Sequence, residues 1–120
     1  MMRKRRESDI VRACLQHLQI LENNGTIHYV DRLNSGKMFV PGRNGKGYMV
    51  RLCREGTADI LVVLRSGANC WIEVKMEGEP QRPKQKEFKI HMLKVPNQFY
   101  FIVHSLDELV GKLKELNPDR

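Results

Sequence analysis

Apolar residues recur at helical spacing near the start of the chain and then gather into short runs that are typical of strands. Gly25 follows the helical pattern at a position where glycine commonly ends a helix. The β-branched and aromatic residues of 26–33 then predict a first strand. The helix is predicted from one apolar face that returns every three or four residues: Ile10, Val11, Cys14, Leu15, Leu18 and Leu21.

Three later runs predict further strands. Residues 59–64 are almost continuously apolar, which indicates a strand that is covered on both faces. A turn at 65–69 leads into 70–76, and the two runs are therefore expected to form an antiparallel hairpin. Residues 98–103 predict another strand.

Two more helices complete the predicted order αβββαβα. Pro83 suits the first turn of a helix over 82–95, which can cross over to a parallel strand. Ser105 and Glu108 form a capping box that opens the last helix. The chain is long enough for one domain, so we expect a mixed α/β (α+β) fold over 1–120 with a central mixed sheet flanked by helices.

Residues 34–50 interrupt the apolar pattern with four glycines and Pro41. Lysines and arginines are interleaved among them, which predicts a mobile, basic hairpin or loop outside the core. Residues 47–53 are expected to return from it to the sheet.

The net charge of the chain indicates what kind of partner it binds. Basic residues outnumber acidic ones by 21 to 14, which gives a net charge of +7. Such a surplus favours a polyanionic partner, nucleic acid or a membrane surface. Residues 1–6 predict a basic N-terminal arm. No apolar stretch reaches the length of a membrane span, so we expect a soluble protein with no membrane partner.

The cysteines and histidines exclude other kinds of site. The three cysteines are widely separated and lack the spacing of a zinc site, which favours a reducing cytoplasm over a disulfide framework. The four histidines are scattered, and we interpret them as incidental.

Asp59, Glu73 and Lys75 place opposite charges inside the predicted hairpin. Directly opposed residues of antiparallel strands share a face, so Asp59 joins the other two only if it lies opposite an odd-numbered residue. This requires a three-residue turn with glycine, or a bulge. Two adjacent carboxylates with open water positions would then suit Mg²⁺ or Mn²⁺, and a lysine beside them would favour hydrolysis of a phosphodiester.

An ordered set of motifs strengthens this interpretation. "ESDI", "DRLNSG", "REGTADILVVL", "CWIEVK" and "RPKQKEF" follow one another in the chain. Over roughly residues 7–110 the chain thus resembles the virus-type replication-repair nuclease (VRR-NUC) domain of the PD-(D/E)XK superfamily. The resemblance implies a restriction-endonuclease-like core and metal-dependent cleavage of DNA.

The resemblance also implies roles for individual residues. Asp59 and Glu73 match the metal carboxylates, the Val74 carbonyl is a candidate third ligand, and Lys75 matches the catalytic lysine. Ala58 stands where the name of the superfamily has proline. That proline is not a ligand, so the difference leaves the predicted site intact.

Further matches lie outside the hairpin. Gln85 matches a glutamine that approaches the site from the helix 82–95, and Glu7 matches an acidic residue that binds the metal through water. Arg32 and Gly36 match an element bordering the path of the DNA. Candidate phosphate contacts come from the basic segment: Lys37, Arg43, Lys46, Arg51 and Arg54.

The expected function is a metal-dependent DNA endonuclease that cuts branched DNA, such as four-way junctions, in replication, recombination or repair. Symmetric cleavage of a junction needs two active sites, hence a homodimer. Two alternatives stay open: a nicking or restriction-like enzyme on ordinary duplex, and a non-catalytic nucleic-acid-binding module. The resemblance implies the cytoplasm of a bacterial or phage-infected cell.

Overall fold

The computed structural model describes residues 6–116, apart from the side chain of Asn44. Most of the predicted basic arm at 1–6 lies outside the described residues. None of the described helices combines the length and the apolar character needed to cross a bilayer. The helices and strands are α1 (Glu7–Asn23), β1 (Ile27–Arg32), β2 (Lys37–Pro41), β3 (Gly47–Arg51), β4 (Ile60–Leu64), β5 (Asn69–Val74), α2 (Pro83–Leu93), β6 (Gln98–Val103) and α3 (Leu106–Leu116), with a 3₁₀ turn at Arg43–Gly45.

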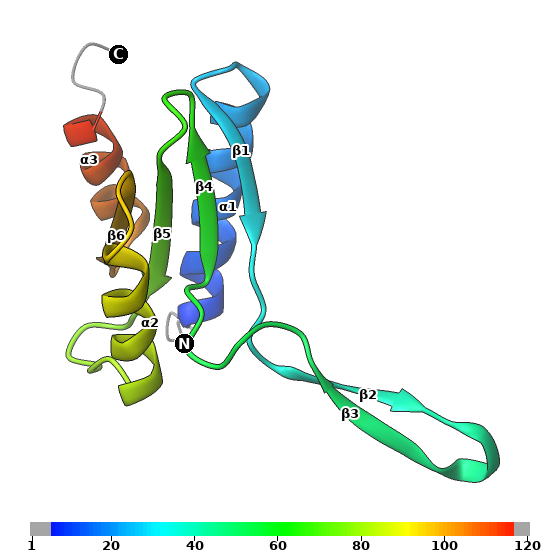
Figure 1. The fold of residues 1–120 in the computed structure, drawn as a ribbon. Coiled ribbons are helices and arrows are strands. Elements are labelled where there is room, and N and C mark those ends of the chain that lie inside the picture. Colours follow the sequence, from blue (N-terminus) through cyan, green and yellow to red (C-terminus); the bar gives the residue numbers. More distant parts are fainter. Residues whose placement is uncertain (1–5, 117–120) are drawn as a thin grey trace, which may run out of the picture.

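The central sheet is mixed, as the sequence predicts. Its strands lie in the order β1–β4–β5–β6. β4 runs antiparallel to β1 and to β5, whereas β6 runs parallel to β5 after the crossover through α2 (Figure 1). The fold is therefore an α/β arrangement of three helices and a mixed sheet within the described part of the chain.

One prediction about the sheet is wrong. Residues 47–53 do not return to it: β3 pairs with β2 in a separate two-stranded ribbon. β1 occupies the edge of the sheet beside β4, so the chain passes from β1 through the ribbon and re-enters at β4. Alternating residues in 47–51 suit a strand in either place, which is why the sequence pattern could not decide between them.

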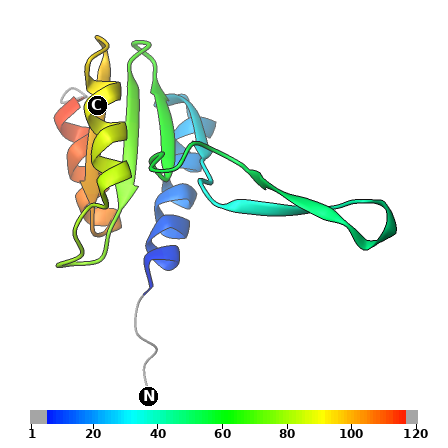
Figure 2. The same cartoon turned by 60° about the horizontal axis from the view of Figure 1, so that its bottom comes forward.

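Helices cover the two faces of the sheet. α1 and α3 lie on one face and α2 on the other (Figures 1 and 2). On the first face α1 buries Ile10, Cys14 and Leu18 among inward-facing residues of the central strands, including Ile60 and Ile72.

The second face is smaller and more polar. Phe88 of α2 meets the edge of Trp71 at 5.2 Å between ring centroids and lies 6.2 Å from Tyr100. The indole N–H of Trp71 donates to the Gln98 side-chain oxygen at 2.7 Å. Trp71 is therefore part of the packing beneath α2.

Candidate functional site

A tight turn between β4 and β5 sets the register of the site. Three residues, 65–67, connect Leu64 to Ala68, and Gly67 has a φ of +93°. Ile60 lies opposite Ile72 at the end of the paired region, with Asp59 just before Ile60 and Glu73 just after Ile72. The prediction of an odd-length turn containing glycine is confirmed, and Asp59 and Glu73 share the face covered by α2.

Asp59 is held at three points just before β4. Its backbone N–H donates to the Ile72 carbonyl at 3.0 Å, and its own carbonyl accepts from the Leu33 N–H at 2.8 Å. The side-chain Oδ2 accepts from the Val74 N–H at 2.7 Å. Burial raises the pKa of Asp59 and the negative charge of Glu73 adds to the rise, although the Val74 N–H and the charge of Lys75 oppose it.

Glu73 is buried in the middle of the site, with 1% of its surface exposed. Its Oε1 accepts hydrogen bonds from the Tyr100 hydroxyl at 2.5 Å and from Nε2 of Gln81 at 2.9 Å. Its Oε2 is also buried and has no hydrogen-bond partner among the described residues. A buried carboxylate oxygen without a donor is costly unless a cation neutralises it.

Tyr100 acts as a permanent donor to this carboxylate. Burial raises the pKa of its hydroxyl, and the hydrogen bond to Glu73 raises it further. The phenol therefore stays protonated and donates to Oε1 of Glu73, while Oε2 receives no hydrogen bond from any described residue.

Lys75 brings a positive charge next to the two carboxylates. Only 3% of its surface is exposed, and its backbone N–H donates to the Val103 carbonyl at 3.0 Å, which extends the pairing of β5 with β6 by one residue. Its charge opposes the rise in pKa at both Asp59 and Glu7. A lysine this deeply buried is rare unless carboxylates compensate it.

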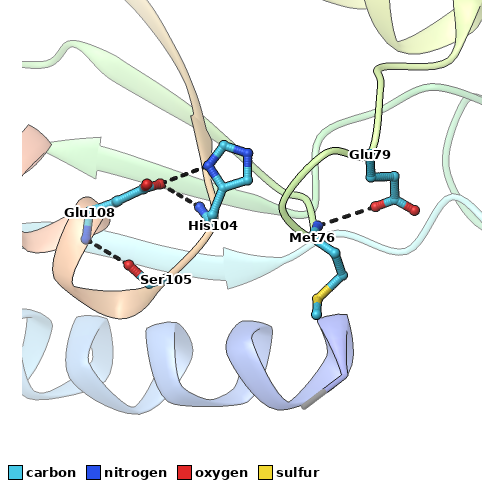
Figure 3. A network of polar contacts seen from close by, with 5 residues as sticks. All are labelled: Met76, Glu79, His104, Ser105 and Glu108. Carbon is cyan, nitrogen blue, oxygen red and sulfur yellow. Dashed lines mark hydrogen bonds and ion pairs between the residues drawn. The ribbon is translucent and has the colours of Figure 1, made fainter. Parts of the chain in front are cut away.

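Glu7 reaches the same end of the sheet from the start of α1, where Asp9 accepts the Arg6 N–H at 3.1 Å and fixes the first turn. Partial burial raises the pKa of Glu7 to about 7, helped by a hydrogen bond with Glu79 and by the charges of Glu79 and Asp59. Glu79 follows β5 and accepts from the Met76 N–H at 3.3 Å (Figure 3).

The two carboxyl groups share a proton unequally. The hydrogen bond from Glu7 lowers the pKa of Glu79, and the Met76 N–H lowers it further. Below about pH 7 the proton therefore resides mainly on Glu7, and Glu79 carries the negative charge. Glu7 was matched from the sequence but Glu79 was missed, because only the folded chain brings the loop after β5 to the start of α1.

The predicted glutamine and the glutamine that contacts Glu73 are different residues. Gln85 is buried, and its side-chain oxygen accepts the Arg82 N–H at 2.8 Å, so it caps α2. Gln81, four residues earlier, donates to Glu73. A catalytic role for Gln85 stays a prediction. Tyr100 was not found because its contact with Glu73 depends on the parallel pairing of β5 with β6. Gln81 was not found because it lies in the loop between β5 and α2, whose path no local pattern fixes.

The candidate basic residues lie in three places: beside the site, along α2 and on the β2–β3 ribbon. The charge of Arg32, which ends β1 opposite Ile60, lowers the pKa of Asp59, so this arginine borders the site. Arg54 lines a cleft of about 620 Å³ along α2. Lys37, Arg43 and Lys46 lie on the β2–β3 ribbon, which extends away from the central sheet (Figure 2).

A second cluster of metal-binding side-chain types lies nearby. The ligand atoms of Glu77, His104 and Glu108 fall within 4.8 Å of one another. Oε2 of Glu108 accepts the His104 backbone N–H at 2.6 Å and lies 3.0 Å from Nδ1 of its ring (Figure 3). Ser105 Oγ accepts the Glu108 N–H at 3.2 Å, which confirms half of the predicted capping box, whereas the Glu108 side chain accepts the N–H of His104 and not that of Ser105. These contacts serve the start of α3.

The donor set of the first site fits a hard divalent cation. Asp59 and Glu73 offer carboxylate oxygens, and the carbonyl of Val74 lies on the same strand. Mg²⁺ and Mn²⁺ prefer such oxygen ligands together with water. The unpartnered Oε2 of Glu73 is the observation that favours a cation here.

Comparisons with known proteins give no family for the chain. No protein-family model matches it, and no curated protein matches it. The function is therefore inferred from the geometry of the site.

Proposed function

We propose that this protein is a metal-dependent DNA endonuclease of the PD-(D/E)XK type, related to VRR-NUC domains. One observation carries the proposal: Glu73, whose charge acts on Asp59, has a buried, unpartnered oxygen beside an equally buried Lys75. A cation at this place would neutralise both carboxylates, and a lysine next to it is suited to phosphodiester hydrolysis.

Asp59, Glu73 and the Val74 carbonyl would hold Mg²⁺ or Mn²⁺, with Glu7 reaching it through water. When bound, the ion would polarise the scissile phosphate and lower the pKa of a bound water. Tyr100 and Gln81 hold Oε1 of Glu73, so that its Oε2 is free to ligate.

The ammonium group of Lys75 orients the attacking water and offsets charge on the phosphate oxygens. The water oxygen bonds to phosphorus as the bond to the 3′ oxygen breaks, and the proton of the water ends on the departing oxygen. The products are a 5′-phosphate and a 3′-hydroxyl.

The proposed substrate is branched DNA, with four-way junctions as the leading case and a homodimer supplying two sites. An enzyme that cuts or nicks ordinary duplex is the second candidate. A module that only binds is disfavoured by Glu73 and Lys75, because burying both charges destabilises the fold with no benefit to binding.

Cleavage of a labelled four-way junction and of its matching linear duplex tests the proposal. The reactions contain Mg²⁺, Mn²⁺ or EDTA, and compare the native chain with Lys75→Ala, Lys75→Met and the surface control Lys112→Ala. We expect metal-dependent paired cuts in the junction, lost in both Lys75 variants and kept in the control.

Three other outcomes would count against parts of the proposal. Equal cutting of junction and duplex would replace the branched substrate with ordinary duplex. Binding without cutting under every condition would leave only the binding module. Activity that survives in folded Lys75→Met, checked by circular dichroism, would remove the role assigned to Lys75.

A further inference from the structure

The positive charge of the protein is concentrated in one segment. Residues 32–54 contain six basic side chains and no carboxylate, which leaves fifteen basic and fourteen acidic residues in the rest of the chain. Nearly all of the net charge of +7 therefore belongs to the β2–β3 ribbon and its two ends. The six are Arg32, Lys37, Arg43, Lys46, Arg51 and Arg54.

The ribbon projects from the end of the sheet that carries the candidate site (Figures 1 and 2). Its base is fixed there, because the Leu52 N–H donates to the Gly36 carbonyl at 3.0 Å and Nη1 of Arg51 donates to the Ser35 carbonyl at 3.0 Å. Leu33, just before it, bonds to the carbonyl of Asp59. A ligand bound along the base of the ribbon would therefore lie next to Asp59.

The two faces of the ribbon carry large apolar side chains. Phe39 pairs with Met49 on one face, and Val40 pairs with Tyr48 on the other. Phe39 is 56% exposed and Tyr48 is 61% exposed. Isolated two-stranded ribbons are only marginally stable in water, so side chains of this kind are usually covered by a partner.

Gly47 shapes one of these faces. A Cβ atom at this position would lie 2.4 Å from Cζ of Phe39, so the absence of a side chain lets the phenyl ring lie across the neighbouring strand. The arrangement keeps the ribbon thin, with cations at its base (Lys37) and on both sides of its tip (Arg43, Lys46).

We infer that the β2–β3 ribbon is a nucleic-acid-binding arm that enters the major groove of a duplex beside the cleaved phosphate. The inference deepens the proposed nuclease function and rests on it. A two-stranded ribbon fits the major groove, and cations at its base and tip can meet the phosphates on either side. Phe39, Tyr48 and Met49 would then contact base edges and thymine methyl groups.

The length of the arm fixes how far it reaches. Five residues in each strand span about 17 Å at roughly 3.3 Å per residue, which corresponds to about five base pairs of B-DNA. The protected region should thus extend about half a turn beyond the cut on one side.

A second copy of the chain is the competing partner for the apolar faces. Two arms would bring cations together with no carboxylate between 32 and 54 to pair with them, and the rest of the chain is close to neutral. Charge complementarity is therefore absent between copies and strong between the arm and a phosphate backbone.

Salt dependence of binding tests the arm directly. We would measure dissociation constants for a 30-base-pair duplex in EDTA by fluorescence anisotropy, between 50 and 300 mM salt, together with the mass of the free protein by light scattering. The arm variant is Lys37→Gln, Arg43→Gln and Lys46→Gln combined. The control combines Arg12→Gln, Arg65→Gln and Lys112→Gln, which are exposed on the body and remove the same charge.

Each phosphate contact contributes about 0.9 to the slope of log affinity against log salt. We expect the arm variant to lower the magnitude of this slope by about 2.7, and the control to change it by less than about 1. The same change in both triple variants would overturn the inference, because the arm would then act only through net charge.

Phe39→Ser with Tyr48→Ser decides between the two partners. Weaker duplex binding with an unchanged mass supports the arm as a DNA contact. Conversion of a dimer to a monomer with an unchanged salt slope would overturn it in favour of an interface between copies. Because these measurements need no metal and no cleavage, the arm can stand or fall separately from the nuclease activity.

Discussion

The end of the β4–β5 hairpin and the β2–β3 ribbon depart from the usual distribution of side chains in opposite ways. At the first, Glu73 and Lys75 place charges in the interior. At the second, Phe39 and Tyr48 place apolar rings in water. Both arrangements destabilise an isolated chain, and the proposed complex would relieve both, with a cation at the carboxylates and a duplex over the ribbon.

Glu73→Gln is the change expected to have the largest effect, because it removes the charge and keeps the shape. Cleavage should fall by at least ~10³-fold, about 4 kcal/mol of transition-state stabilisation. Mg²⁺ at a hundred times its dissociation constant should stabilise the native protein by about 2.7 kcal/mol and the variant far less. Thermal unfolding with and without Mg²⁺ gives the second readout. The exposed Glu115→Gln is the control, and an equal metal-induced shift in Glu73→Gln would place the cation elsewhere.

Gly56, near the candidate site, and Gly45, at the tip of the ribbon, both have positive φ, so alanine at each position measures how tightly the two regions are packed. Gly56 (φ +88°) is buried, and a Cβ there would lie 2.3 Å from the Lys84 carbonyl oxygen at the start of α2. Gly45 (φ +72°), at the tip of the ribbon, has open space around it. Gly56→Ala should cost about 3 kcal/mol of unfolding free energy and Gly45→Ala about 1 kcal/mol, measured by urea denaturation. Equal losses of unfolding free energy in the two variants would mean that α2 moves away from the new Cβ atom at little cost.

The sequence allowed more of the site to be predicted than of its surroundings. Strand alternation and the parity of the turn are enough to place Asp59, Glu73 and Lys75 on one face, because these rules are local. The position of Gln81 depends on the path of the loop between β5 and α2, and that of Tyr100 depends on how β6 pairs with β5. That pairing joins residues about thirty positions apart, and no local pattern encodes its register.

The path of the chain after β2 shows the same limit. Residues 47–51 have the alternation of a strand, which a ribbon and a sheet edge satisfy equally. The absence of carboxylates from 32 to 54 is the signal that could have separated the ribbon from the body, since the segments on either side of it mix both charges.

Tyr100→Phe tests how the buried charge is held. Oε1 of Glu73 would keep only the Gln81 donor, so the folded state should lose about 1–3 kcal/mol without metal. Cleavage should fall by roughly tenfold, since the carboxylate is less well held but still present. Tyr29→Phe is the matched control, because the Tyr29 hydroxyl also donates to a carboxylate, that of the exposed Asp31. Equal stability of the two variants would show that Tyr100 contributes little to holding Glu73.

Glu7→Gln should have the smallest effect and depends on pH. The folded pKa of Glu7 is about 7 and its ordinary value is 4.5, so between these values the folded state binds more protons than the unfolded state. Stability attributable to Glu7 is therefore greatest below about pH 4.5 and is lost as the pH rises through 7. Glu79, whose pKa is lowered, acts in the opposite direction but below pH 4.5. Melting temperatures should decline less between pH 4.5 and 7 in Glu7→Gln than in the native protein. A parallel decline in both would mean that the proton shared with Glu79 does not reside on Glu7, and that this end of the site is charged throughout.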